Sequence, residues 1–294
     1  MAYACGKKAG CRPDVFSDLQ GTRMIWVNEK PQPFRRGMTL AELASAIDPG
    51  ADIFIVNGHP VSATTALQVG DHCWVWRRGR VPSAAEMGQL LHARHTPGVQ
   101  ERLQASAVGI MGLGGLGSLV AVALARMGIG ALLLADYDVV EPTNLNRQYY
   151  FLEQIGQKKV TALCETLGRV NPHVAVTCLD KRLVEEDIAK EFTGVDALVE
   201  CFDDPAMKAA SLRAVLRDLS GVYYVCSSGV AGYGDNALIR TRRLYPGVYL
   251  VGDEESAAAP GQGLMAARVG IAAHQQANQV VRLLLAAEKE DERG

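Results

Sequence analysis

The segment that most restricts the fold is a glycine-rich run, Gly-Leu-Gly-Gly-Leu-Gly-Ser, at residues 112–118. It follows the apolar residues 107–111, which fit a buried strand, and it leads into residues 118–127, which fit a helix. Glycines before a helix N-terminus leave backbone N–H groups open to phosphate oxygens, because no side chain blocks the approach. A plain tight turn is the alternative, but the strand and helix on either side favour a phosphate-binding loop.

The chain beyond this run alternates between strand and helix patterns. Such alternation predicts an α/β, Rossmann-like fold whose mostly parallel sheet is covered by helices on both faces. We expect strands at 107–111, 131–135, 174–179, 195–200 and 222–226, and helices at 84–93, 99–104, 118–127, 158–170, 184–191, 206–219 and 264–287.

The earlier part of the chain has another pattern. Residues 24–27, 52–56 and 72–76 fit strands, and a helix with one apolar face fits between the first two. Thr39 is a candidate N-cap for that helix, and Asn57-Gly58 is a tight-turn signal. This order predicts a small β-grasp (ubiquitin-like) domain. The expected domains are a disordered extension at 1–22, the β-grasp domain at 23–81 and the α/β domain at 82–294.

Charge and cysteine content exclude several classes of protein. The 30 Lys and Arg against 32 Asp and Glu give a net charge of −2, which does not suit a generally basic nucleic-acid-binding protein. The seven cysteines form no Cys-x-x-Cys pair, so we expect no zinc site and a cytoplasmic protein with reduced thiols. Residues 104–125 carry no charge, but glycines interrupt them, so we expect no membrane span.

Polar residues follow the second predicted strand of the α/β domain. Asp136 lies 19 residues after Gly117, where an acid can bind ribose hydroxyls, and this pattern alone fits NAD as well as ATP. The loop that follows contains Asp138, Asn144 and Arg147. An arginine there offers a planar fork to phosphate oxygens, which suits a triphosphate better than a nicotinamide. An NAD-dependent oxidoreductase remains the alternative from another class.

Two further segments add charge near the same edge of the sheet. Lys158 and Lys159 open a helix, where a bound anion would offset their unfavourable interaction with the helix dipole; a solvated lysine pair is the alternative. After the fourth strand, Asp204 precedes Pro205 and fits a helix N-cap. Asp203 is then left without a structural role. A carboxylate there suits Mg²⁺ bound to phosphates, and a second turn residue is the alternative.

Together these motifs resemble the ThiF/MoeB/HesA family of adenylating enzymes, relatives of ubiquitin-activating enzymes. The resemblance rests on the glycine loop, the Asp-x-Asp at 136–138, the Asn-Leu-Asn-Arg-Gln at 144–148, the Gly-x-x-Lys at 156–159 and the Cys-x-Asp at 201–203. It implies a homodimer that uses ATP and Mg²⁺ to adenylate the C-terminal carboxylate of a ubiquitin-like sulfur carrier. The implied nucleotide-binding residues are Gly112, Gly114, Gly115, Gly117, Asp136, Asp138 and Asn144; the implied catalytic residues are Arg147, Lys159, Asp203, which also holds the metal, and Arg94, which a partner subunit would supply.

The β-grasp segment resembles the sulfur carrier ThiS, but its last strand continues into Arg77-Arg-Gly-Arg instead of ending in Gly-Gly. We therefore expect it to regulate, dock or stabilise, and we expect the substrate to be a separate ThiS-like carrier. The fusion favours thiamine thiazole synthesis. A molybdopterin-carrier adenylating enzyme, a tRNA-modifying dehydratase and an idle binding module remain alternatives. Cys226 is expected to be a buried core thiol, with a thiol role in catalysis as the alternative.

Overall fold

The computed structural model describes residues 23–95 and 98–286. The chain divides into two compact units, with the boundary between Arg94 and His95. This division differs from the boundary expected at residues 81 and 82, because helix α2 (Ala84–His95) counts with the first unit up to Arg94. The extension expected at 1–22 and the last residue of the expected closing helix, 287, lie outside the described residues.

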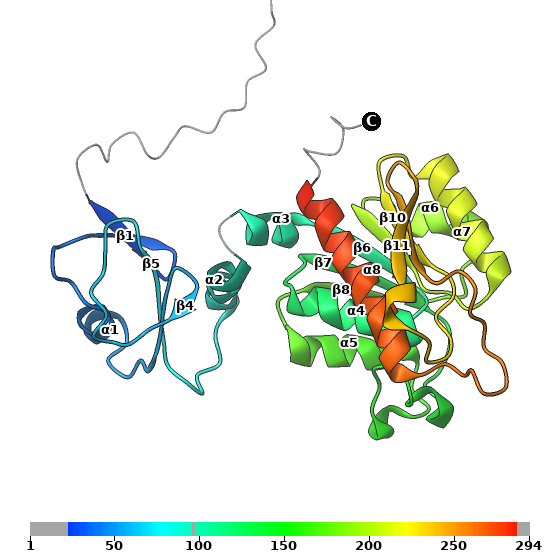
Figure 1. Cartoon of the computed structure of the whole chain (residues 1–294), viewed down its shortest axis with the longest axis horizontal. Coiled ribbons are helices and arrows are strands. Elements are labelled where there is room, and N and C mark those ends of the chain that lie inside the picture. The colour runs from blue at the N-terminus through cyan, green and yellow to red at the C-terminus, as the bar shows by residue number, and fades with distance from the viewer. Residues whose placement is uncertain (1–22, 96–97, 287–294) are drawn as a thin grey trace, which may run out of the picture. The chain divides into compact units, whose positions relative to one another are not determined.

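The first unit contains a five-stranded sheet in the order β2-β1-β5-β3-β4 (Figure 1). Strands β1 and β5 pair in parallel at its centre, and the other neighbours are antiparallel. This is the predicted β-grasp arrangement. Its elements are β1 (Met24–Val27), β2 (Lys30–Pro33), α1 (Leu40–Ile47), β3 (Ile53–Val56), β4 (His59–Pro60) and β5 (His72–Trp76).

Local sequence explains the turns of this unit. Asn57 and Gly58 both have positive φ and close the β3–β4 hairpin, which confirms the predicted turn. Thr39 is the N-cap of α1, as predicted. The structure adds a reciprocal capping box between Thr39 and Glu42. Leu40 of α1 is fully buried in one apolar cluster with residues of β1 and β5, so α1 packs on one face of the sheet.

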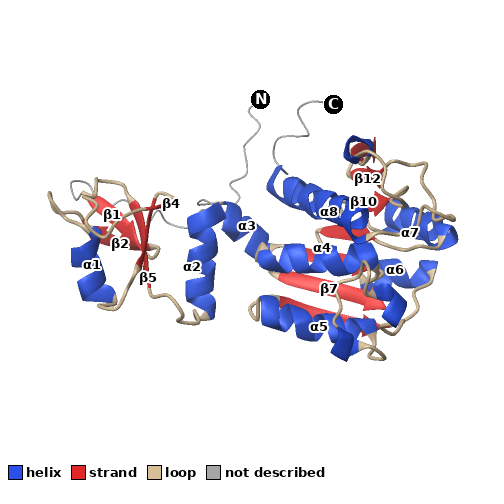
Figure 2. Ribbon diagram, turned by 60° about the horizontal axis from the view of Figure 1, so that its bottom comes forward, coloured by secondary structure: helices blue, strands red, loops and turns tan. Residues whose placement is uncertain are grey.

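The second unit contains a seven-stranded sheet in the order β11-β12-β10-β9-β6-β7-β8, flanked by helices (Figure 2). All neighbours pair in parallel except β11, an antiparallel edge strand. The predicted α/β fold with a mostly parallel sheet is confirmed. Its helices are α3 (Val99–Ala105), α4 (Gly115–Arg126), α5 (Lys159–Val170), α6 (Glu185–Glu191), α7 (Pro205–Asp218) and α8 (Ala266–Ala286), with short 3₁₀ turns at Pro142–Asn144, Leu152–Gln154 and Asn236–Leu238. Its strands are β6 (Ala107–Met111), β7 (Ala131–Asp136), β8 (Ala175–Asp180), β9 (Ala197–Glu200), β10 (Tyr223–Ser227), β11 (Arg240–Tyr245) and β12 (Val248–Gly252).

Two apolar cores cover the two faces of this sheet. Val108 and Ile110 of β6 belong to the core that contains α4, α5 and α8, whereas Met111 belongs to the core with α6 and α7. Successive strand residues point to opposite faces, so an apolar run with no polar position is what a doubly covered strand requires.

The strand order locates the functional edge of the sheet. The first strand of this sheet along the chain is β6, which lies inside the sheet. The next two strands, β7 and β8, are added on one side of β6, and β9 is added on its other side. In open α/β sheets, ligands bind outside the carboxyl ends of the strands at such a reversal. The loops after β6, β7 and β9 therefore mark the expected crevice.

No helix in the described ranges 23–95 and 98–286 is long and apolar enough to cross a membrane. The uncharged stretch at 104–125 is divided among the end of α3, strand β6, the glycine loop and most of α4, as its glycines suggested.

Candidate active site

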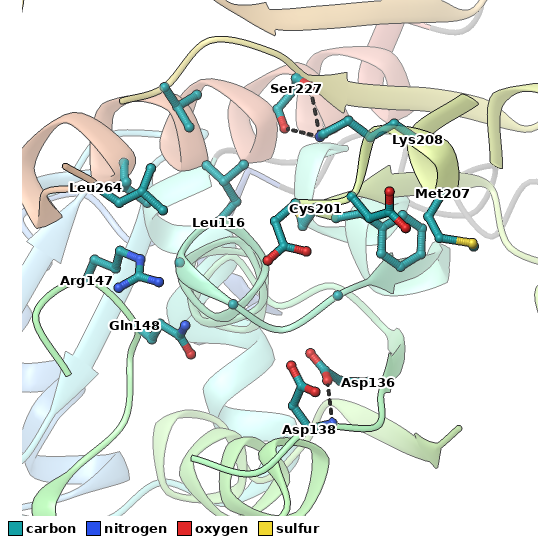
Figure 3. Close-up of a pocket in the computed structure, with 18 of the residues that line it drawn as sticks. Leu116, Asp136, Asp138, Arg147, Gln148, Cys201, Met207, Lys208, Ser227 and Leu264 are labelled. Atoms are coloured by element: carbon teal, nitrogen blue, oxygen red, sulfur yellow. Dashed lines mark hydrogen bonds between the residues drawn. The ribbon is translucent and has the colours of Figure 1, made fainter. Parts of the chain in front are cut away.

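A cavity of about 400 Å³ lies at the carboxyl edge of the parallel sheet (Figure 3). It is bounded by the glycine loop after β6, the acidic segment after β7, the residues after β8 and β9, the start of α7, and the loops that precede α8. Its lining includes, among the residues expected from the sequence, Gly112, Gly114, Gly115, Asp136, Asp138, Arg147, Lys159 and Asp203. The crevice predicted by the strand order is therefore where these residues gather.

The glycine loop is shaped by backbone contacts that a side chain would prevent. Gly112 has φ +83°, and a Cβ there would lie 2.9 Å from the carbonyl oxygen of Cys201. A Cβ on Gly117 would lie 1.9 Å from the carbonyl oxygen of Gly112. Helix α4 begins at Gly115, three residues earlier than predicted, so its first N–H groups border the cavity.

Asp136 fixes this loop from the end of β7. Its Oδ2 accepts a hydrogen bond from Leu113 N at 2.6 Å, and its Oδ1 accepts one from Asp138 N at 2.8 Å. The buried carboxylate thus satisfies two backbone N–H donors of the site through contacts within the protein. Asp136, which the sequence predicts to bind ribose, is therefore observed to hold the glycine loop in place.

Residues 147–150 are tied to the same loop from the other side. Ser118 Oγ donates to Gly114 O at 2.7 Å and accepts from Tyr149 N at 2.9 Å, while Tyr150 Oη donates to Leu113 O at 2.8 Å. Asn144, although predicted to serve phosphates, does not line the cavity, and its Oδ1 accepts from Glu141 N. Its observed role is to hold the turn that carries Arg147.

The two lysines at the start of α5 each meet a carboxylate. Lys159 Nζ lies 2.9 Å from Asp138 Oδ2, with the lysine side chain 8% exposed and the aspartate 47% exposed. Lys158 Nζ lies 3.2 Å from Asp180 Oδ1 and donates to Tyr137 O. Neighbouring carboxylates therefore offset the unfavourable interaction of both lysines with the helix dipole. Lys159 also lines the cavity.

The residues after β9 divide their tasks. Asp204 caps α7, because its Oδ1 accepts from Ala206 N at 2.9 Å and Pro205 occupies the first helical position, as predicted. Asp203 is exposed and lines the cavity, and its side chain has no hydrogen-bond partner within the described part of the chain. Its carboxylate is therefore available to a ligand.

An ion pair with one buried carboxylate joins two strand ends next to this turn. Glu200, at the end of β9, is fully buried and pairs with Lys208 at 2.9 Å. Burial raises the pKa of Glu200, although Lys208 opposes that effect. Glu200 also accepts from Phe202 N, and Lys208 donates to Ser227 O at 3.0 Å, so the pair joins the ends of β9 and β10.

A second ion pair, buried on both sides, holds the segments of the cavity lining that precede α8. Arg268, at the start of α8, pairs with Asp253 and donates to Gly234 O. Burial opposes ionisation of Asp253, but hydrogen bonds from Ser256 N and Glu255 N, together with Arg268, outweigh it and lower its pKa to about 2. The lining segments before and after β11 and β12 are thereby fastened to α8.

Three residues expected in the site do not line this cavity. Gly117 acts through loop packing and Asn144 through its turn, while Arg94 lies in the first unit and donates to Gly58 O there. Conversely, Gln148, Lys208 and Arg182 line the cavity without having been predicted. Gln148 stands in the quoted motif and could have been included; the other two have no distinctive local sequence.

Cys226 lies at the end of β10 in the core beside α6 and α7. Burial raises its pKa to about 12, so its thiol is protonated at neutral pH. The expectation of a buried core thiol fits this environment.

The residues present suit a nucleoside triphosphate and a magnesium ion. The glycine loop and the start of α4 offer N–H donors, Arg147 and Lys159 offer cations, and Leu116, Leu183 and Met207 add apolar surface. Mg²⁺ is commonly held by one or two carboxylates together with substrate phosphates and waters, a role that Asp203 can fill.

Family models match both parts of the chain. Residues 87–293 match the ThiF family, and residues 24–79 match the ThiS-like ubiquitin family. The second match covers the β-grasp unit from β1 to just beyond β5.

Curated relatives match part of the chain. A molybdopterin-synthase adenylyltransferase of Escherichia coli is 38% identical over 110 residues, which are 37% of this chain and 44% of the relative. A ubiquitin-like modifier-activating enzyme 5 of Arabidopsis thaliana is 35% identical over 130 residues, 39% of this chain and 30% of the relative. The chain thus spans less than half the length of these two relatives.

A solved structure shares the fold of the second unit. The tRNA N6-threonylcarbamoyladenosine dehydratase of E. coli, crystallised with ATP, superposes with a TM-score of 0.64 over 73% of this chain and all of that chain, at 22% identity. Because the family match covers residues 87–293, well over half of the sequence, this chain belongs to the ThiF family.

Proposed function

We propose that this protein uses ATP and Mg²⁺ to adenylate the C-terminal carboxylate of a separate, ThiS-like sulfur carrier. The observation that carries the proposal is the cavity itself. There the glycine loop, the side chains of Arg147 and Lys159, and the unpaired carboxylate of Asp203 converge at the point where the strand order of the sheet reverses. The family match and the adenylyltransferase among its relatives support the same activity.

The chemistry requires positioning more than proton transfer. A peptide α-carboxylate, with a pKa near 3.5, is already an anion at pH 7, so no general base is required. Its oxygen attacks the α-phosphorus, the bond to the bridging oxygen breaks, and pyrophosphate departs with that electron pair. Cations and N–H donors at the developing charge, and a rigid in-line arrangement, should therefore supply the acceleration.

Each lining residue has a role in this scheme. Gly112, Gly114 and Gly115 admit the phosphates to the start of α4, while Arg147 and Lys159 bind phosphate oxygens. Asp203 would hold the magnesium ion, which neutralises phosphate charge when bound.

Asp136 and Asp138 complete the nucleotide site. Asp136 would add a ribose hydroxyl to the two backbone donors that it already accepts. Asp138 keeps Lys159 oriented toward the cavity.

The fused β-grasp unit bears on the choice of carrier. A ThiS-like domain joined to a ThiF-like domain favours a role in thiamine thiazole synthesis. We propose that this domain is not itself the substrate, because β5 continues through Arg77 toward α2 and offers no terminal carboxylate. In a homodimer, Arg94 would reach the phosphates of the partner subunit, as the family resemblance implies.

ATP–pyrophosphate exchange tests the proposal. The full chain is assayed with Mg²⁺ and, in separate arms, a ThiS-like carrier, a molybdopterin carrier and tRNA. We expect exchange with the ThiS-like carrier and no exchange without any carrier. Exchange with another arm would reassign the substrate. Calorimetric binding of NAD at an affinity equal to that of ATP would instead favour the oxidoreductase.

A further inference from the structure

Two cysteines lie at the contact between helix α5 and the edge strand β8 (Figure 1). Cys164 belongs to α5 and Cys178 to β8, and both are free, half-buried thiols. Cys178 packs against the core on the α5 side of the sheet. Neither cysteine lines the cavity, so the proposed adenylation uses neither of them.

The Cys178 thiol contacts the turn of α5 that leads to Cys164. Its Sγ donates a hydrogen bond to Val160 O at 3.5 Å. In an α-helix, that carbonyl oxygen also accepts the backbone N–H of the residue four positions later, which is Cys164. Helical side chains lean toward the helix N-terminus, so the Cys164 side chain extends over the turn that carries Val160. Both thiols therefore lie beside the same carbonyl group.

The two thiols are unequal in reactivity. Burial, followed by the neighbouring Cys164 thiol, raises the pKa of Cys178 to about 12, so Cys178 is protonated at neutral pH. Attack on an oxidant requires a thiolate, so the first attack is assigned to Cys164. The other described cysteines, which are Cys73, Cys201 and Cys226, are buried and therefore less accessible to an oxidant than Cys164.

We infer that Cys164 and Cys178 form a redox-active dithiol, which a small-molecule disulfide oxidises to one intramolecular disulfide bond. The Cys164 thiolate attacks one sulfur of the small molecule, and a thiolate departs with the electron pair of the broken bond and takes up the proton that Cys164 lost. Cys178 Sγ then attacks Cys164 Sγ, and its proton goes to the second departing thiolate. The two protein thiols lose two electrons, and the small-molecule disulfide is reduced to two thiols.

The disulfide would join two segments that lead into the cavity. Helix α5 begins at Lys159, and β8 continues into Lys181 and Arg182, all of which line the cavity. A bond between residues 164 and 178 closes a short loop and so restricts the unfolded chain. Oxidation should therefore raise the Tm and fasten this wall of the cavity.

Peptide mapping of the full-length protein tests the inference. The protein is incubated with oxidised or with reduced glutathione, its remaining thiols are blocked with iodoacetamide in denaturant, and it is digested without reduction. Oxidised glutathione should link the peptides of Cys164 and Cys178 in most of the protein, and dithiothreitol should separate them again. The Tm of the oxidised protein should exceed that of the reduced protein by about 5 °C.

Single variants identify the pair. Cys164→Ala and Cys178→Ala should each abolish the cross-link and the rise in Tm. Cys178→Ala should also leave glutathione bound to Cys164, because no second thiol is present to release it. Cys73→Ala is the matched control, since it removes a buried cysteine of the first unit and should keep the cross-link. Thermal unfolding of the reduced variants checks that they fold.

Three outcomes would overturn the inference. One is recovery of both cysteines as blocked thiols after oxidation of the wild type. Another is a lasting mixed disulfide on Cys164 of the wild type with Cys178 still free. The third is a cross-link that persists in Cys178→Ala, which would assign it to another pair. None of these measurements uses ATP or a carrier, so the inference and the proposed function can fail separately.

Discussion

At the residue scale, the acidic side chains of the cavity differ in their hydrogen-bond and ion-pair partners. Asp136 accepts from two backbone N–H groups, Asp138 pairs with Lys159, and Asp204 caps α7. Asp203 has no such partner in the described chain, although it stands next to the cap. Hydrogen bonds thus hold Asp136, Asp138 and Asp204 in structural roles, whereas the carboxylate of Asp203 stays available for the proposed ligand.

This separation makes Asp203→Asn a clean test of the metal site. The substitution should leave the free energy of unfolding unchanged, because Asp204 provides the cap. It should lower the exchange rate about a hundredfold, or about 3 kcal/mol of transition-state stabilisation, through loss of a magnesium ligand. Asp204→Ala, in contrast, should cost about 1 kcal/mol of stability in urea unfolding. Wild-type exchange in Asp203→Asn would place the metal elsewhere.

Lys208 carries a prediction about stability. Lys208→Met leaves the fully buried Glu200 without its cation and should destabilise the fold by about 3–5 kcal/mol in urea unfolding. Lys208→Arg keeps the charge and should lose less. The double variant Glu200→Gln/Lys208→Met should recover part of the loss, because no buried charge remains. A loss below about 1 kcal/mol in Lys208→Met would contradict this account.

At the element scale, glycines on two helices of the same domain offer a matched comparison. Gly117→Ala should disrupt the glycine loop, since its Cβ would lie 1.9 Å from Gly112 O. We expect a loss of more than about 3 kcal/mol of stability and of measurable ATP binding. Gly168 of α5 has open space around its Cβ position, so Gly168→Ala should gain about 0.5–1 kcal/mol. Equal Tm values for the two variants would refute the role given to the loop.

The pair between Asp253 and Arg268 predicts an acid-sensitive connection between α8 and the cavity wall. The folded-state pKa of Asp253, about 2, is below its ordinary value, so its contribution to stability is present above pH 4 and is lost as the pH falls through 2. Between pH 5 and pH 2, the wild type should lose about 2 kcal/mol more than Asp253→Asn. Glu254→Gln, which removes an exposed pair with Arg242, should follow the wild type. Urea unfolding across that range measures both differences.

The elements also show how far the sequence alone leads. Five of the six parallel strands and the amphipathic helices were predictable, because burial on two faces imposes a readable pattern. Strand β12, although apolar and parallel to β10, was not predicted. Strand β2 was not predicted because its residues, Lys-Pro-Gln-Pro, lack apolar alternation. The edge strand β11 was not predicted because four of its six residues are exposed arginine and threonine. Arg182 and Lys208 could not be recognised as cavity residues, since their local sequence is not distinctive and only the fold brings them to the cavity.

At the scale of the whole molecule, the cavity belongs to the second unit. Its lining begins at Gly112, beyond the β-grasp domain. Deletion of residues 1–80 should therefore leave carrier-dependent exchange measurable. Mass spectrometry of the full chain incubated with ATP alone should find no AMP adduct on it, whereas a carrier ending in Gly-Gly should gain one. A folded truncation without any exchange would show that the β-grasp domain contributes to the reaction.

The unbroken passage of the chain from β5 toward α2 has a consequence for stoichiometry. A free carrier and its activating enzyme are synthesised separately, so their ratio follows expression and their encounter depends on concentration. Here one β-grasp domain accompanies each ThiF-family domain at every expression level. Any effect of this domain on its own chain is intramolecular, so its rate does not change when the protein is diluted. Association with a separate carrier is bimolecular, and its rate falls on dilution.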